Sequence, residues 1–294
     1  LMDTKPVCDS MRVLFIRRIF MNMIRKVSVA ALSLVLLAGC GSASTKETHD
    51  DHKLTVGMEC NYAPFNWSTT TANEYTQQIS TVDYCDGYDV AIAKKVADSL
   101  GMELEVVKYD WDNLIPGLQN NEIDAVIAGM TATDDRKMSV DFTDPYYTSQ
   151  EVVIVRKDSS LTSITDIQDL KGKTVKGQLN TLYDTIIDQI EGVNHGTAMD
   201  NYPSLVNDLL NNGCDAITAE LPVAEGIVAS NPDLTYVTFK DGHGFKADTS
   251  VSIAVKKGNT ELLDKIQKAL NSISEDERQQ IMLEAVKRQP AVSK

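Results

Sequence analysis

A twelve-residue segment occurs twice in this chain, 91 positions apart, and this repeat constrains the fold more than any other feature. Residues 118–129 read LQNNEIDAVIAG and residues 209–220 read LLNNGCDAITAE, so that six of the twelve positions are identical. Each copy is typical of the end of a helix, a turn rich in Asn and Asp, and a buried strand. Two copies of one αβ unit predict two similar α/β halves.

Short β-like runs alternate with helical periods in the first half. We expect strands over 54–58, 104–108 and 125–130, and helices over 88–100 and 113–120. In the first of these helices the apolar residues recur three and four positions apart, with lysines and an aspartate on the opposite face, so that one side packs on a sheet. Strand, helix and strand at this spacing predict parallel βαβ units.

The length and the net charge of the chain restrict the classes of protein to which it can belong. The chain has 294 residues, which is enough for two domains of medium size, and its content of 43% apolar and 24% charged residues is typical of globular proteins. Its net charge is −14. Nucleic-acid binders usually carry a basic face, so we expect no nucleic-acid partner.

The N-terminal part carries an export signal. Arg25 and Lys26 precede an apolar run over 27–37, which is the layout of a secretory signal peptide. The run is too short for a membrane-spanning helix, which needs about 20 apolar residues. Residues 37–40 read LAGC and resemble the lipobox of bacterial lipoproteins, in which the cysteine receives a diacylglyceryl group. We therefore expect Cys40 to carry a lipid.

The remaining N-terminal residues divide into two segments. Residues 1–39 form an upstream extension and the signal peptide, with translation expected to start at Met21 or Met23. Residues 40–53 are polar and suit a flexible tether. The tether contains His, Asp, Asp and His in succession, which could be read as metal ligands, but a flexible segment offers no fixed geometry. We expect no metal and no cofactor.

Three cysteines remain in the predicted exported domain. Cys60 and Cys85 flank one long loop, and because an exported protein can be oxidised we predict a disulfide between them. Cys214 stands in an apolar strand context, which predicts a buried free thiol.

A binding site is expected beyond the strand ends, because open α/β sheets bind ligands at the carboxyl ends of their strands. This places residues 129–136 of the first copy and Glu220 of the second beside a shared site. Thr133 can cap a short helix there, and Arg136 offers a planar fork of donors suited to a carboxylate. The alternative interpretation is a capped surface turn with a solvated arginine.

Residues 128–147, AGMTATDDRKMSVDFTDPYY, closely resemble the signature of the amino-acid-binding proteins of ABC importers, the family 3 extracellular solute-binding proteins. Residues 63–65 (APF), 87–93 (GYDVAIA) and 169–175 (DLKGKTV) match as well, and the resemblance covers nearly all of 54–286. It implies an α/β fold of the type II periplasmic-binding-protein kind, in which two Rossmann-like lobes are joined by a two-segment hinge.

The resemblance also implies the domain boundaries. Lobe 1 comprises residues 54–146 plus 251–294, including two C-terminal helices, and lobe 2 comprises residues 147–250. The hinge segments lie near 146–150 and 247–251.

Roles follow by the same resemblance. Arg136 clamps the α-carboxylate of an amino acid, helped by Thr131 and the backbone near Gly129. Glu220 aligns with the acidic residue that holds the α-ammonium group. In lobe 2 the turn before the helix expected over 182–190 also contacts the carboxylate. The residues of this turn that are expected to contact the carboxylate are Thr181 first, then Asn180 and Gln178. Leu179 stands where the family usually has Gly.

Glu59, Tyr62 and Trp111 resemble the pocket walls that contact the ligand's side chain. Two aromatic faces and a carboxylate favour a cationic ligand, which is arginine, lysine or histidine. The alternatives are glutamine or another polar amino acid, and an aromatic residue in an α/β protein is also often only part of the core.

The function that the resemblance implies is capture of a free amino acid and its delivery to the permease of an ABC importer. We expect a monomer, exported and lipid-anchored at the outer face of the bacterial cytoplasmic membrane, that touches the membrane only through its lipid. Dehydratase-like enzymes, transglycosylase regulatory lobes and receptor sensor lobes share this fold. However, the sequence has no nucleophile elbow, P-loop or histidine set, and we expect no appended domain after Lys294 and no enzyme.

Overall fold

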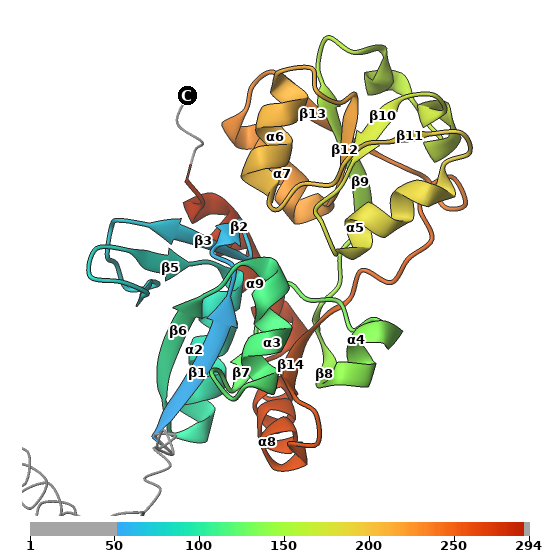
Figure 1. The fold of residues 1–294 in the computed structure, drawn as a ribbon. Helices are drawn as coiled ribbons and strands as arrows, with labels where there is room; N and C mark the ends of the chain where they lie inside the picture. Colours follow the sequence, from blue (N-terminus) through green and yellow to red (C-terminus); the bar gives the residue numbers. More distant parts are fainter. Residues whose placement is uncertain (1–51, 291–294) are drawn as a thin grey trace, which may run out of the picture. The chain divides into compact units, whose positions relative to one another are not determined.

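The computed structural model describes residues 52–290, which form two five-stranded sheets and one four-stranded sheet (Figure 1). The predicted signal peptide over 1–39, Cys40 and the predicted tether up to residue 51 lie outside the described residues. The tether was predicted to reach residue 53, but Lys53 already belongs to the first strand, Lys53–Met58. Within residues 52–290, every helix is too short or too polar to cross a membrane.

The first sheet takes its strands from both ends of the described chain. Its order is β6–β1–β7–β14–β8, in which β1 is parallel to β6 and β7, and β14 is antiparallel to β7 and β8. The strands are β1 (Lys53–Met58), β6 (Glu103–Lys108), β7 (Ala125–Val126), β8 (Val140–Tyr147) and β14 (Val251–Lys256). The helices of the same part of the chain are α2 (Tyr88–Leu100), η1 (Trp111–Asn113), α3 (Leu114–Gln119), α4 (Asp134–Ser139), α8 (Thr260–Asn271) and α9 (Glu275–Arg288).

These bounds confirm most of the expected elements. The helix expected over 88–100 is present with those bounds and ends at Gly101, whose φ of 69° is left-handed. The helix expected over 113–120 is divided into a 3₁₀ turn and α3. The strand expected over 125–130 is wrong in length, because β7 has two residues and the chain turns away at Gly129, whose φ is 60°.

A small antiparallel sheet replaces the long loop expected between Cys60 and Cys85. Its strands, in the order β2–β3–β5–β4, are β2 (Asn61–Tyr62), β3 (Asn66–Thr69), β5 (Tyr84–Asp86) and β4 (Gln77–Gln78). Cys60 and Cys85 are buried free cysteines in this structure, so the predicted disulfide is wrong here. Burial, together with the neighbouring Cys60, raises the pKa of Cys85 well above its usual value.

The second sheet repeats the plan of the first. Its order is β11–β10–β12–β9–β13, in which β10 is parallel to β11 and β12, and β9 is antiparallel to β12 and β13. The strands are β9 (Glu151–Arg156), β10 (Thr174–Lys176), β11 (Asn194–His195), β12 (Ala216–Glu220) and β13 (Leu234–Thr238). The helices are η2 (Ser160–Ser163), η3 (Ile167–Leu170), α5 (Leu182–Thr185), η4 (Ile186–Gln189), α6 (Tyr202–Leu210) and α7 (Leu221–Ser230).

Two connections join the sheets. The first runs from the end of β8 to the start of β9 and the second from the end of β13 to the start of β14.

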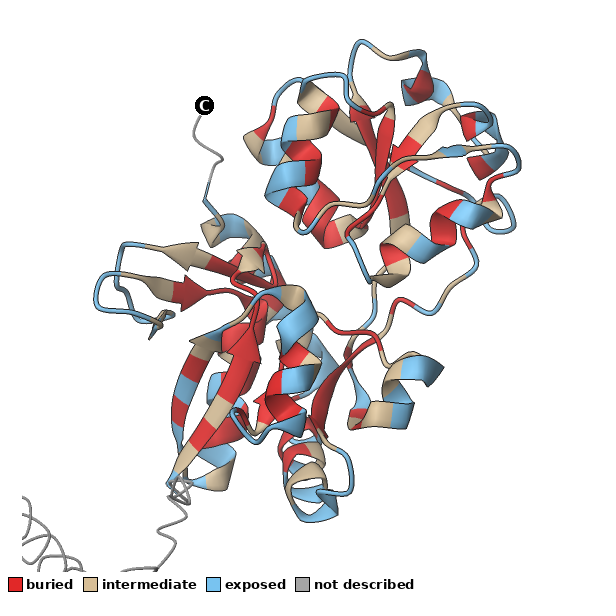
Figure 2. Cartoon of the chain, in the orientation of Figure 1, coloured by how far each residue is buried: buried red, intermediate tan, exposed pale blue. Residues whose placement is uncertain are grey.

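Cys214, which precedes β12, is a buried free cysteine, as expected. Figure 2 shows that the strands of both large sheets are mostly buried, whereas the outer faces of their helices are exposed.

The repeat in the sequence is also a repeat in the structure. Asn121 and Asn212, 91 positions apart, both have left-handed backbones, with φ of 60° and 61°. Three positions later, the carboxylate of Asp124 accepts a hydrogen bond of 2.8 Å from the backbone N–H of Thr55 in β1. Asp215 accepts the same bond, also of 2.8 Å, from Thr174 in β10. Each aspartate therefore fastens the start of its own strand to the neighbouring parallel strand.

We predict that these aspartates stabilise the two sheets equally and independently. Asp124→Ala and Asp215→Ala each leave a backbone donor without its acceptor, which costs about 1–3 kcal/mol. For this size the loss lowers the melting temperature by about 2–4 °C per kcal/mol. The measurement is thermal unfolding followed by circular dichroism.

The matched controls are Asp124→Asn and Asp215→Asn, which keep an acceptor oxygen and are expected to be milder. The effects in the double alanine variant should add, since the two sites lie in different sheets. An effect in only one sheet would contradict the equivalence of the two copies.

Candidate functional site

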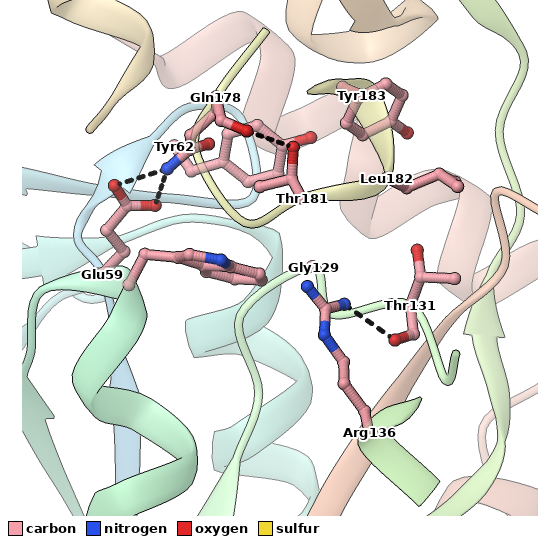
Figure 3. Close-up of a pocket in the computed structure, with 10 residues that line it drawn as sticks. Glu59, Tyr62, Gly129, Thr131, Arg136, Gln178, Thr181, Leu182 and Tyr183 are labelled. Carbon is pink, nitrogen blue, oxygen red and sulfur yellow. Dashed lines mark hydrogen bonds between the residues drawn. The ribbon is translucent and has the colours of Figure 1, made fainter. Parts of the chain in front are cut away.

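A pocket lies beyond the carboxyl ends of parallel strands from both large sheets. Glu59 follows β1, Gly129 follows β7 at a distance of three residues, and Gln178 follows β10. The pocket holds about 310 Å³ of space between its walls, part of which is open to solvent. Ten residues line it (Figure 3), namely Glu59, Tyr62, Trp111, Gly129, Thr131, Arg136, Gln178, Thr181, Leu182 and Tyr183.

The structure brings the residues predicted from the sequence together. All of them line the pocket except Asn180 and Glu220, and these two make hydrogen bonds to residues that do. The sequence analysis missed Leu182 and Tyr183. Both stand in the first turn of α5, directly after Thr181. The helix start predicted there was the signal that could have found them.

Glu59 and Gln178 meet across the pocket. The side-chain amide nitrogen of Gln178 donates to both carboxylate oxygens of Glu59, at 3.0 and 3.2 Å, as Figure 3 shows, and to the backbone oxygen of Asp200 at 3.0 Å. Glu59 is 3% exposed. Burial raises its pKa from 4.5 to about 7, and the hydrogen bond from Gln178 offsets part of that shift.

Glu220 and Tyr62 form a second hydrogen bond between a buried carboxylate and a neutral donor. Here the carboxylate belongs to the second sheet and the donor to the first half of the chain. Glu220 ends β12 of the second sheet and accepts a hydrogen bond from the hydroxyl of Tyr62, which belongs to β2 of the small antiparallel sheet. Glu220 is fully buried, and its pKa is raised from 4.5 to about 8, chiefly by burial, although the bond from Tyr62 lowers it. Among the described residues, the Oε2 atom of Glu220 and the hydroxyls of Ser149 and Tyr183 are buried outside good hydrogen-bonding geometry, although both hydroxyls lie close enough to Glu220 to lower its pKa. This orphaned carboxylate oxygen can accept a donor from a bound molecule.

Arg136 is held in the wall of the pocket by its helix and its neighbours. Thr133 caps α4, as predicted, and accepts a hydrogen bond from the backbone N–H of Arg136. The guanidinium donates to the backbone oxygens of Thr131 at 2.9 Å and Asn180 at 3.0 Å. Burial lowers its pKa to about 10, so that it remains charged at neutral pH.

The turn before α5 differs from the expectation. Leu179 stands where the family usually has Gly, but the residue with the left-handed backbone is Asn180, with a φ of 57°. Asn is among the few residues that tolerate this conformation, so the turn keeps its shape without glycine. The carbonyl oxygen of Asn180 accepts hydrogen bonds from Arg136 and from the indole of Trp111, at 3.3 Å. Its side chain donates to Asp112 at 2.9 Å.

A buried network fixes the backbone at Gly129. The hydroxyl of Tyr146 donates to Asp89 at 2.6 Å and accepts from the backbone N–H of Gly129 at 3.0 Å. A Cβ atom at position 129 would lie 2.8 Å from the ring of Tyr62, and its φ of 60° also favours glycine. The N–H of Gly129 is therefore engaged inside the protein, which leaves Arg136 as the main donor on this side of the pocket.

The two aromatic rings of the pocket lie in different surroundings. Tyr62 stacks on Phe65, with ring centroids 5.3 Å apart, and tilts against Tyr202. The guanidinium of Arg136 lies 5.1 Å from the ring centroid of Trp111. That a ligand side chain lies between Tyr62 and Trp111 remains a prediction.

Comparisons with known proteins agree with this architecture. Residues 54–285 match the model of the bacterial extracellular solute-binding proteins, family 3. The arginine-binding extracellular protein ArtP of Bacillus subtilis (strain 168) is 33% identical over 250 residues, which cover 84% of this chain and 91% of that protein.

Solved structures are similar over most of their length. An amino acid ABC transporter substrate-binding protein, AbpA from Streptococcus pneumoniae Canada MDR_19A bound to L-arginine, has a TM-score of 0.71 at 29% identity. The match covers 83% of this chain and 97% of that one. An ancestral arginine-binding protein bound to glutamine has a TM-score of 0.67 at 33% identity, over 80% of this chain and 98% of that one.

The raised pKa values predict that stability in the absence of added ligand falls as the pH rises. A carboxyl group whose pKa is higher in the folded protein stabilises it below the unfolded pKa, and this contribution is lost as the pH passes through the folded pKa. For Glu59 and Glu220 the window runs from about 4.5 to about 8. We expect the melting temperature to fall by several degrees between pH 5 and pH 8.

The control is the Glu59→Gln/Glu220→Gln double variant, which removes both titrating groups and should flatten the pH profile. A residual slope is expected, because burial raises the pKa of Asp89 to about 6 as well. Identical slopes for the double variant and the wild type would contradict the assignment.

Proposed function

Because the chain belongs to the bacterial extracellular solute-binding proteins of family 3, we propose that it captures a free cationic amino acid, arginine first, and delivers it to an ABC importer. Members of this family and the neighbours described above are binding proteins of ABC transporters rather than enzymes. The observation that carries the proposal is a pocket lined by the half-buried guanidinium of Arg136 and the buried carboxylate of Glu59, with the buried carboxylate of Glu220 bonded to the lining residue Tyr62. An amino acid with a cationic side chain presents the complementary charges.

Arg136 is the proposed partner of the ligand's α-carboxylate. A guanidinium presents a planar fork of donors that matches the two oxygens of a carboxylate. The backbone oxygen of Thr131, in the same proposed lobe, accepts from one of its donors and orients the group, and the backbone oxygen of Asn180 in the other proposed lobe accepts from a second. Thr131 and Thr181 line the same pocket and can supply further contacts.

Glu220 is the proposed partner of the α-ammonium group. Its Oε2 atom is buried and lacks a partner among the described residues, and burial favours its neutral form. An ammonium group brought against it supplies both a hydrogen-bond donor and a compensating charge. Binding is therefore expected to stabilise the ionised carboxylate and to release a proton near neutral pH.

Glu59 is the proposed partner of the ligand's side chain, together with Trp111 and Tyr62. A carboxylate beside aromatic rings suits a guanidinium or an ammonium group through ion pairing and cation–π attraction. Several relatives are named as arginine-binding or histidine-binding proteins, which favours a cationic ligand. Glutamine is the second candidate, because one similar arginine-binding protein has been solved with glutamine bound.

Capture is proposed to work by closure of two lobes, residues 54–146 plus 251–294 and residues 147–250. The hinge is placed in the connections near 146–150 and 247–251. In the open form a ligand meets Arg136, Tyr62 and Trp111, and closure adds Thr181 and Glu220 while excluding water. Micromolar affinity corresponds to about −8 kcal/mol, so contacts made only on closure must exceed the cost of closing.

The proposed cellular setting follows from the N-terminal sequence. Residues 1–39 carry the export signal, and Cys40 receives the lipid that holds a monomeric receptor at the outer face of the membrane. The permease of the importer is the proposed protein partner.

Binding is tested with the soluble fragment 42–294 and a thermal-shift screen of the twenty amino acids, ornithine and cystine, followed by calorimetry on each hit. A ligand at 100 times its Kd stabilises the folded protein by about 2.7 kcal/mol. We expect arginine to give the largest shift. Arg136→Ala and Glu220→Gln should each weaken binding by about 30-fold or more, because each leaves a buried ligand charge unpaired.

Lys137→Ala is the matched control, since this exposed neighbour on α4 lies outside the pocket and should leave the Kd unchanged. Affinity should be higher at pH 8 than at pH 6, because a larger fraction of both glutamates is ionised at pH 8, and Glu220→Gln should reduce this difference. A response to glutamine alone would mean that glutamine, and not a cationic amino acid, is the ligand. A folded protein that binds no amino acid would refute the proposal.

Lipid attachment is tested by expressing the full chain in a bacterial host supplied with radiolabelled palmitate. We expect label in the protein and recovery in the membrane fraction, both lost in Cys40→Ser. Cys214→Ser, which changes a free cysteine far from the N-terminus, is the control and should change neither. An unlabelled wild-type protein in the soluble fraction would contradict the anchor.

A further inference from the structure

Gln178 occupies the side of the Glu59 carboxylate that a cation with two parallel donors, such as a guanidinium, would approach. Its amide nitrogen lies 3.0 Å from one carboxylate oxygen and 3.2 Å from the other, so that one donor is shared between both. A guanidinium that pairs with a carboxylate through two parallel hydrogen bonds approaches that same side. Both residues are 3% exposed, so water does not compete for this contact.

The amide is held there by a second acceptor. Gln178 also donates to the backbone oxygen of Asp200 at 3.0 Å, and its backbone forms a bridge with Met199. Turning the amide over would place its oxygen against three acceptor oxygens, so the surroundings fix the orientation. Its own backbone oxygen accepts the hydroxyl of Thr181 at 2.7 Å, which further fixes the turn.

We propose that Gln178 is a specificity-determining residue that makes Glu59 bind the ligand's side-chain cation through one oxygen rather than two. This inference rests on the proposed function, since it concerns the same pocket. A carboxylate has about four lone-pair sites, and Gln178 leaves the outer ones available. One outer site is sufficient for the ammonium group of lysine or ornithine, which is a point charge, whereas a guanidinium forfeits its second hydrogen bond.

The proposed role of Gln178 affects the discrimination between arginine and lysine more than the affinity for either one. With Gln178 in place, arginine gains less over lysine from Glu59 than an unoccupied carboxylate would allow. The loop of Gln178 lies opposite Glu59, so the contact also favours closure for every ligand equally. The ratio of the two dissociation constants therefore isolates the proposed effect.

The experiment measures the Kd of arginine, lysine and ornithine by calorimetry for wild type and Gln178→Met, which keeps the length of the side chain without the donor. We expect the ratio of the lysine Kd to the arginine Kd to rise about tenfold, the effect of one charge-assisted hydrogen bond. Gln178→Asn, whose amide is one methylene shorter, should shift the ratio in the same direction and serves if the methionine variant does not fold.

Two controls separate this role from a merely structural one. Gln168→Met changes an exposed glutamine outside the pocket and should leave the ratio unchanged. In a Glu59→Gln background, Gln178→Met should no longer change the ratio, because the carboxylate is gone. An unchanged ratio in a folded Gln178 variant that still binds arginine overturns this inference alone. Wild-type protein that binds no cationic amino acid overturns it together with the proposed function.

Discussion

Two buried carboxylates, Glu59 in the lining of the pocket and Glu220 bonded to the lining residue Tyr62, set the condition on which the rest of this structure depends. Glu59 and Glu220 are removed from water, and each is met by a neutral donor from the opposite side, Gln178 and Tyr62 respectively. Neutral donors reduce the cost of burial but do not cancel the charge, so both pKa values stay raised. Such a site favours a cation strongly, provided that the strands behind it hold the two groups in place.

The repeated αβ unit supplies that rigidity. In both large sheets a helix ends, an asparagine takes a left-handed backbone, and an aspartate fastens the next strand to its parallel neighbour. The strands then end at the pocket, where β12 delivers Glu220 directly and β7 leads to Gly129. The repeated packing unit thus gives each large sheet an edge that ends at the pocket. The two edges differ in the side chains that stand at the ends of their strands.

The sequence predicted the parts of the fold that depend on periodicity and on capping. The helix over 88–100 and the cap at Thr133 follow from local rules and were confirmed. The small antiparallel sheet was missed, because its strands have two to four residues and little alternation. The pocket contacts of Asn180 and Tyr183 depend on how two distant segments meet, which single-sequence patterns do not encode. The pairing of Cys60 with Cys85 was inferred from exposure to oxidants, yet apolar packing is sufficient to bury both as thiols.

The order of strands in the first sheet has a consequence for biosynthesis. Strand β14 lies between β7 and β8, but it is the last strand of the chain and follows the whole of the second sheet. The first sheet therefore cannot be completed until residue 256 has left the ribosome, whereas the second sheet needs no residue beyond 238. Until then β8 has no partner strand in its sheet, so the edge of the first sheet that β14 will join stays open while the second sheet can already form.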